Sequence, residues 1–139
     1  MENLGEFVIN HWVLVTLFVV LLGLVLSDSF HSKLSGINSI GTAQAIQIIN
    51  QRKGLFLDVR DSAEFSKEHI ADSENMPISS LADSLSKLKD PAQPIILVCA
   101  SGQRARGAAK QLRSKEFSEV YVLSGGLNAW REAKLPLFS

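Results

Sequence analysis

Residues 94–113 read PIILVCASGQRARGAAKQLR, and this stretch decides the fold. Its first part, Ile95-Ile96-Leu97-Val98, is a continuous apolar run typical of a parallel strand that is covered on both faces. The loop from Cys99 to Arg104 follows. After it, apolar residues recur at the i, i+3, i+4 and i+7 spacing of a helix with one buried face: Ala105, Ala108, Ala109 and Leu112. The stretch therefore predicts a strand, a tight loop and a helix.

The chain on both sides of this stretch alternates helix-like and strand-like segments. Helices are predicted from Thr42 to about Arg52, over 61–69, from Ser79 or Ser80 through Leu88, and after Gly125-Gly126. Extended segments are predicted at 55–59, 75–77 and 120–123. Because strands separated by helices are joined by right-handed crossovers, the pattern predicts an α/β fold with a parallel sheet and helices on both faces.

Length and composition exclude several classes of protein. A chain of 139 residues allows one ordinary domain and a modest appendage. Fourteen Lys and Arg balance fourteen Asp and Glu, so no global basic field points to nucleic acid as a partner. With 46% hydrophobic and 20% charged residues, the chain lacks the signature of disorder. A single cysteine excludes an intramolecular disulfide and a CxxC cluster, and we expect neither a metal nor an organic cofactor.

The segment from Phe7 to Leu26 has 20 residues and no Asp, Glu, Lys or Arg. At about 1.5 Å per residue, such a helix is roughly 30 Å long, which matches the hydrocarbon core of a bilayer. The sequence thus predicts a tail at 1–6, a transmembrane helix at 7–26, a Ser- and Gly-rich linker at 27–40 and a domain at 41–139. A buried helix, a membrane-surface helix and a signal peptide are the alternatives. The first six residues contain two glutamates and no basic residue, which argues against a signal peptide, although Val25-Leu26-Ser27 leaves a cleavage site open.

The distribution of basic residues gives an expected orientation. No Lys or Arg precedes the apolar segment, and the nearest ones after it are Lys33, Arg52 and Lys53. The positive-inside rule then places the domain in the cytoplasm, and the chain is expected to cross an inner or plasma membrane once.

Cys99 lies where an open parallel sheet binds ligands, directly beyond the carboxyl end of a strand. A loop wrapped around the sulfur at a helix N-terminus would aim backbone N–H groups and the helix dipole at it, favouring the thiolate. Gly102 permits a tight turn, and Arg104 adds a positive charge at the end of the loop. By itself, the pattern C-x-x-G-x-R also fits a cysteine that is only a small buried apolar residue, and an ordinary arginine at the start of a helix.

Several further segments, in a fixed order, carry a family resemblance. They are Leu57-Asp58-Val59-Arg60, Glu64-Phe65, His69-Ile70, Asn75-Met76-Pro77, the loop from Cys99 to Arg104, and 125–130, which reads GGLNAW. With these segments, residues from about Ile40 to Leu137 resemble the rhodanese family of single-domain sulfurtransferases. The sequence departs from the family pattern at two places. Glu68 stands where the family commonly has glycine, and Asp72-Ser73 stands where the family has a pair of small residues.

The resemblance implies a doubly wound parallel sheet with helices on both faces, here preceded by the one predicted transmembrane helix. It also implies that Cys99 takes the outer sulfur of a small anionic donor such as thiosulfate, becomes a persulfide, and passes the sulfur to cyanide, a thiol or a protein acceptor. The loop residues Ala100, Ser101, Gly102, Gln103 and Arg104 match the part that binds the donor. Asp58 and Arg60 match positions expected to form a structural ion pair, His69 is expected to be structural, and Trp130 is expected to pack in the core.

Two other functions compete with sulfur transfer. Cysteine-dependent phosphatases of the related cell-cycle type use a loop one residue longer, C-x5-R, but the position that would be arginine is Ala105. A membrane-tethered rhodanese module with little activity, serving as an interaction platform, is the third hypothesis, and an intact Cys99 argues against it. Arg106, Lys110 and Arg113 form a basic stripe on one helix, which is interpreted as a solvated face rather than a docking site for an acidic partner.

Overall fold

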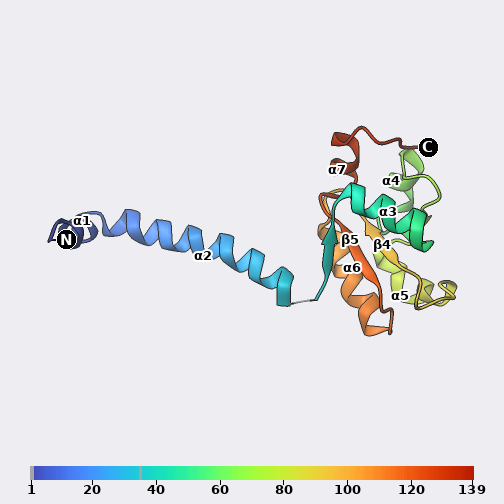
Figure 1. The fold of residues 1–139 in the computed structure, drawn as a ribbon, viewed down its shortest axis with the longest axis horizontal. Coiled ribbons are helices and arrows are strands. Elements are labelled where there is room, and N and C mark those ends of the chain that lie inside the picture. The colour runs from blue at the N-terminus through green and yellow to red at the C-terminus, as the bar shows by residue number, and fades with distance from the viewer. Residues whose placement is uncertain (1, 35) are drawn as a thin grey trace. The chain divides into compact units, whose positions relative to one another are not determined.

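The computed structural model describes residues 2–34 and 36–139. The chain divides into two compact units, residues 1–36 and residues 37–139. Figure 1 shows the described part of the first unit as helices and the second as a sheet with helices around it. Each unit is described by itself below.

The first unit holds helix α1 (Glu2–Asn10) and helix α2 (Trp12–Leu34), and this corrects the prediction of one unbroken helix over 7–26. The break falls at the polar residues Asn10 and His11, where Nδ1 of His11 lies 3.1 Å from the carbonyl oxygen of Phe7. Taken singly, no described helix has the length and hydropathy needed to cross a bilayer. Segments Asn3–Asn10 and Trp12–Ser27 have the required length and hydropathy only when they are taken together, and the chain bends by 85° between them.

The predicted linker at 27–40 is also more regular than expected. Helix α2 continues through Leu34, and strand β1 (Asn38–Ile40) begins shortly afterwards. The sequence of β1 is too short and too polar to indicate a strand. It is extended because it pairs in parallel with strand β5 (Val120–Leu123), with Ile40 opposite Leu123, and this pairing supplies hydrogen bonds that a local pattern cannot show.

The second unit contains a parallel sheet, as predicted, and it has five strands instead of the four extended segments that the sequence indicated. The remaining strands are β2 (Leu55–Asp58), β3 (Glu74–Asn75) and β4 (Ile95–Val98), and the order across the sheet is β1-β5-β4-β2-β3. Strand β4 lies at the centre, with Leu57 opposite Leu97 on one side and Leu97 opposite Val122 on the other. All four residues of β4 are buried, which is why the sequence shows an unbroken apolar run there.

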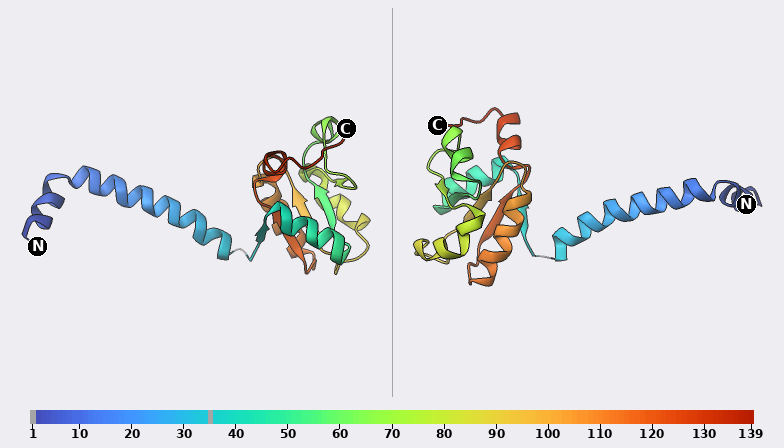
Figure 2. Two further views of the ribbon diagram at one scale, coloured as in Figure 1. Left: turned by 45° about the horizontal axis from the view of Figure 1, so that its top comes forward. Right: turned by 180° about the vertical axis from the view of Figure 1, so that it is seen from behind.

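Helices cover both faces of this sheet (Figure 2). Helix α6 (Gln103–Ser114) and the short helix α5 (Leu81–Ser84) pack on one face, against alternate strand residues such as Ile95 and Leu97. Helix α3 (Thr42–Arg52) and helix α7 (Gly126–Glu132) pack on the other face, against Ile96 and Val98. The alternation of side chains along β4 thus divides the core into two layers.

Two predicted helices differ from expectation in detail. The predicted helix from Ser79 or Ser80 through Leu88 is a series of short turns, with α5 flanked by 3-10 turns at Ile78–Ser80 and Leu85–Lys87. Gly41 rather than Thr42 occupies the N-cap position of α3. The acidic segment at 61–69 forms helix α4 (Ser62–Lys67), as predicted.

Candidate active site

Cys99 is the first residue after β4, and α6 begins four residues later, at Gln103. The central strand and the buried alanine face of α6 together set the position of this loop, because both are anchored in one layer of the core. Cys99 is 1% exposed. Burial alone is also a property of an inert core cysteine, so the chemistry of this thiol depends on what surrounds it.

The loop turns back so that its own backbone faces the sulfur. The N–H of Gly102 donates a hydrogen bond to Sγ of Cys99 over 2.9 Å. Gly102 occupies the N-cap position of α6, and its φ is +98°. Residues with a Cβ rarely adopt this backbone conformation. The first N–H groups of α6 follow directly, and helix geometry leaves such groups without a partner inside the helix. The arrangement favours negative charge at the end of the Cys99 side chain.

A second turn, at Gly125-Gly126 between β5 and α7, places backbone N–H groups that bind the carbonyl groups of the Cys99 loop. The N–H of Leu127 donates to the carbonyl oxygen of Cys99 over 2.9 Å, and the N–H of Asn128 donates to that of Ala100 over 3.1 Å. Gly126 has φ of +54°, and a Cβ added there would lie 2.1 Å from the Cys99 carbonyl oxygen. Only glycine allows the two backbones to come this close.

Arg104 lies in the first turn of α6 and forms a two-pronged ion pair with Glu64 of α4. Nη1 donates to Oε2 over 2.8 Å and Nη2 donates to Oε1 over 3.0 Å. The hydrogen bonds from Arg104 hold the pKa of Glu64 at about 2, below its usual range. The hydrogen bond with Glu64 is in turn the main cause that raises the pKa of Arg104, and the charge of Cys99 is a smaller cause in the same direction. Arg104 is thus held mainly by Glu64.

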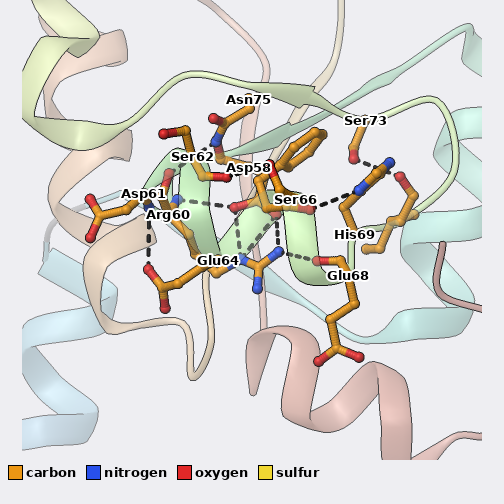
Figure 3. Close-up of polar contacts among 12 residues, drawn as sticks. Asp58, Arg60, Asp61, Ser62, Glu64, Ser66, Glu68, His69, Ser73 and Asn75 are labelled. Carbon is orange, nitrogen blue, oxygen red and sulfur yellow. Dashed lines mark hydrogen bonds and ion pairs between the residues drawn. The ribbon is translucent and has the colours of Figure 1, made fainter. Parts of the chain in front are cut away.

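Asp58 and Arg60 form the predicted ion pair at the end of β2, and both are buried. Nη2 of Arg60 donates to Asp58 Oδ2 over 2.7 Å and to the carbonyl oxygen of Glu68 over 2.6 Å (Figure 3). The side-chain amide of Asn75 donates to the carbonyl oxygens of both Asp58 and Arg60. This network joins β2, β3 and the chain after α4, so it holds the scaffold on which Glu64 lies.

His69 and Trp130 have the structural roles expected of them. The ring of His69 stacks on Phe65 with the ring centroids 4.0 Å apart, and its backbone pairs with Phe138 near the C-terminus. Trp130 is buried beside Phe56, and its Nε1 donates to the carbonyl oxygen of Pro136 over 3.0 Å. The residues of the basic stripe, Arg106, Lys110 and Arg113, are all exposed on α6.

The predicted site residues come together in one loop, with differing exposure. Cys99 and Gly102 are buried, Ala100 and Arg104 are half-buried, and Ser101 and Gln103 are exposed. Sequence reasoning missed the part played by Glu64 and by the turn at Gly126, because both lie far from the loop along the chain. Among the side chains that the structure describes, at 3–27 and 36–139, no three of His, Cys, Asp or Glu are grouped as a metal site requires.

Comparisons with known proteins agree with this geometry. Residues 42–133 match the family described as "Rhodanese-like domain". The "Uncharacterized protein YibN" of Escherichia coli strain K12 is 32% identical over 99% of this chain and 97% of its own length. "Thiosulfate sulfurtransferase GlpE" of Pseudomonas savastanoi is 35% identical over 61% of this chain and 79% of its own length.

A solved structure extends the likeness to three dimensions. The rhodanese-related protein from Thermoplasma volcanium superimposes with a TM-score of 0.62 at 29% identity, covering 73% of this chain and 97% of that one. The family match covers strands β2 to β5 and the helices from α3 onward, including the Cys99 loop and the glycine turn that supports it. On these grounds the chain belongs to the family of proteins with a rhodanese-like domain.

Proposed function

We propose that the protein is a sulfurtransferase that carries a sulfur atom on Cys99. The observation that carries this proposal is the loop geometry, in which the Gly102 N–H donates to Cys99 Sγ at the N-terminus of α6. The same features that favour a thiolate also favour the persulfide anion that replaces it, because the negative charge stays among backbone donors. The name of the GlpE relatives, thiosulfate sulfurtransferase, supports thiosulfate as one donor.

The proposed reaction has two displacements. The Cys99 thiolate attacks the outer sulfur of thiosulfate, a bond forms between Sγ and that sulfur, and sulfite leaves with the electron pair of the broken S–S bond. A nucleophile such as cyanide or a thiol then attacks the terminal sulfur, and the electron pair of the second S–S bond returns to Cys99. When Cys99 attacks as the thiolate, neither step needs a general base beside it.

The loop length favours sulfur transfer over phosphate chemistry. Arg104 is the fifth residue after Cys99, and the next position is Ala105, which is fully buried against the sheet. An arginine at 105 would have to place its guanidinium in an apolar layer without a partner, which is costly. The loop therefore suits a single sulfur atom better than a phosphate group.

Intact mass spectrometry tests the proposal directly. The full chain is weighed before and after incubation with thiosulfate, and again after a reductant, with Cys99→Ser as the matched control. We expect a gain of about 32 Da, one sulfur atom, that the reductant removes and the control lacks. A folded protein that gains no sulfur from thiosulfate or from an alkyl persulfide would overturn the proposal and favour the interaction module.

We further propose that the N-terminal unit anchors the domain in an inner or plasma membrane, with residues 37–139 in the cytoplasm. Large apolar side chains of α2, among them Leu14, Phe18 and Leu24, are exposed within the described structure. A continuous exposed surface of this kind indicates a contact with lipid or protein. The bend at His11 leaves Trp12–Ser27 as the segment that would enter the bilayer.

Membrane fractionation tests the anchor. We expect the full chain to stay in the membrane pellet after alkaline extraction, and a variant lacking residues 2–27 to be released. In closed spheroplasts, added protease should leave the domain intact, and it should cut the domain once the membrane is opened. Release of the full chain by alkali, or a mature protein whose mass lacks the first residues, would contradict the anchor.

A further inference from the structure

The ion pair between Glu64 and Arg104 changes how this cation, at the end of the Cys99 loop, can bind an anion. An arginine binds an oxyanion best through two parallel N–H bonds, one from each of two nitrogens. In this structure both terminal nitrogens, Nη1 and Nη2, already bind the two oxygens of Glu64. An incoming anion therefore meets an arginine whose two-pronged face between Nη1 and Nη2 is occupied by a carboxylate.

Glu64 is held in this position from its other side. Its Oε2 also accepts a hydrogen bond from the backbone N–H of Asp61 over 3.2 Å, as part of a capping box at the start of α4. The helix thus fixes the carboxylate independently of Arg104. A donor that breaks the ion pair still faces the negative charge of Glu64, because the capping box keeps that carboxylate near the loop.

We infer that Glu64 is a specificity-determining residue, which cancels the charge of Arg104 and makes the site favour sulfur donors less negative than thiosulfate. The inference rests on the sulfurtransferase activity proposed above and names its substrate class. Thiosulfate carries two negative charges, which are shared between its terminal sulfur and the three oxygens of its sulfonate group. An alkyl persulfide, R–S–SH, carries at most one, and its leaving group needs no cation to bind it.

The reaction with an alkyl persulfide balances without an oxidant or a metal. The Cys99 thiolate attacks the outer sulfur, a bond forms between Sγ and that sulfur, and the bond to the inner sulfur breaks. The electron pair stays on the inner sulfur, which takes the proton of the persulfide and leaves as the thiol R–SH. Cys99 then carries the same persulfide anion that thiosulfate produces.

Glu64→Gln tests the inference with little change of shape, because glutamine also serves in a capping box. We expect the KM for thiosulfate to fall about three- to tenfold, the size expected for removing one partly screened charge near a dianion. The kcat for thiosulfate and both constants for an alkyl persulfide should change less than about twofold. The effect on thiosulfate should shrink as salt is added.

Glu68→Gln is the matched control. Glu68 also forms an ion pair with an arginine, Arg131, and its side chain is 37% exposed against 39% for Glu64, but Arg131 lies outside the Cys99 loop. We expect this variant to keep the wild-type preference between the two donors. An equal fall in the thiosulfate KM in both variants would show a general charge effect and overturn the inference.

A double substitution and a binding measurement complete the test. In an Arg104→Gln background, Glu64→Gln should no longer lower the thiosulfate KM, because the cation that it unmasks is absent. Calorimetry of thiosulfate with Cys99→Ser, with and without Glu64→Gln, measures the anion affinity in the absence of turnover. Equal affinities in those two proteins would overturn the inference, whereas a wild-type protein that gains sulfur from neither donor would overturn the proposed function instead.

Discussion

Gly126→Ala should be severely destabilising, although it adds a single methyl group. The new Cβ would lie 2.1 Å from the Cys99 carbonyl oxygen and 2.8 Å from the carbonyl carbon and oxygen of Ala100. All of these neighbours are backbone atoms, so no flexible side chain can move aside. The α7 turn and the Cys99 loop must separate by about 1 Å to reach an ordinary contact distance.

The magnitude follows from what that separation breaks. The hydrogen bonds from Leu127 to Cys99 and from Asn128 to Ala100, now 2.9 and 3.1 Å, would stretch beyond hydrogen-bond length, at about 0.5–1.5 kcal/mol each. Holding alanine at φ of +54° costs about 1–2 kcal/mol more. The smaller entropy of the unfolded variant offsets about 0.4–1 kcal/mol. We expect a net loss of about 2–4 kcal/mol.

Thermal unfolding of the full chain, followed by near-ultraviolet circular dichroism in mild detergent, measures this loss. For a domain of this size, each kcal/mol lowers Tm by about 4–8 °C, so the variant should melt at least about 8 °C below wild type. Gly107→Ala is the matched control, because Gly107 is an exposed residue within α6 whose added Cβ would meet only Ile78 Cδ1, at 3.6 Å. That control should melt at or slightly above the wild-type temperature, since alanine favours a helix.

A Gly126→Ala protein that melts within about 3 °C of wild type would refute the reasoning. It would mean that the two backbones do not approach as closely as the structure shows. Where the variant remains folded at low temperature, the displaced loop should also form the Cys99 persulfide more slowly, and intact mass after thiosulfate would detect this.

Three further predictions concern the scaffold around the site. Arg60→Leu leaves Asp58 buried without its partner and should cost about 3–5 kcal/mol in urea unfolding, and adding Asp58→Asn should recover part of that loss; no recovery would contradict an ion pair. Glu64 has a folded pKa of about 2, below its ordinary value, so its ion pair stabilises the fold above about pH 4.5 and loses this effect as the pH falls towards 2. Because both partners are more than a third exposed, the stability gap between wild type and Glu64→Gln should be about 1 kcal/mol or less at pH 7, should narrow below about pH 4.5 and should close only as the pH approaches 2; a gap that stays constant from pH 7 to pH 2 would contradict this. Trp130→Phe removes the hydrogen bond from the indole and part of a buried ring, and should lower the free energy of unfolding by about 1–2 kcal/mol; an unchanged value would show that the hydrogen bond contributes nothing.

The N-terminal segment shows where an apolar pattern misleads. Hydropathy over 7–26 describes composition, and it predicted one unbroken helix because a bilayer-long run without charges usually forms one. At the bend, Nδ1 of His11 lies near the carbonyl oxygen of Phe7, and a hydropathy average does not contain local contacts of this kind. Strand β1 was missed for a related reason, because its three residues are extended only through their pairing with β5.

The sequence by itself determined the α/β class, the central strand and the loop that holds Cys99. Each of these follows from local chemistry, since an unbroken apolar run, a glycine at a turn and an alanine stripe have few structural solutions. Tertiary structure alone decided which distant residues serve the loop. Glu64 lies 40 positions from Arg104, and Gly126 reaches the Cys99 carbonyl from the next strand of the sheet. Such contacts arise because a parallel sheet brings the ends of different strands to one edge. The residues that make these contacts are far apart in the sequence and share no local sequence pattern.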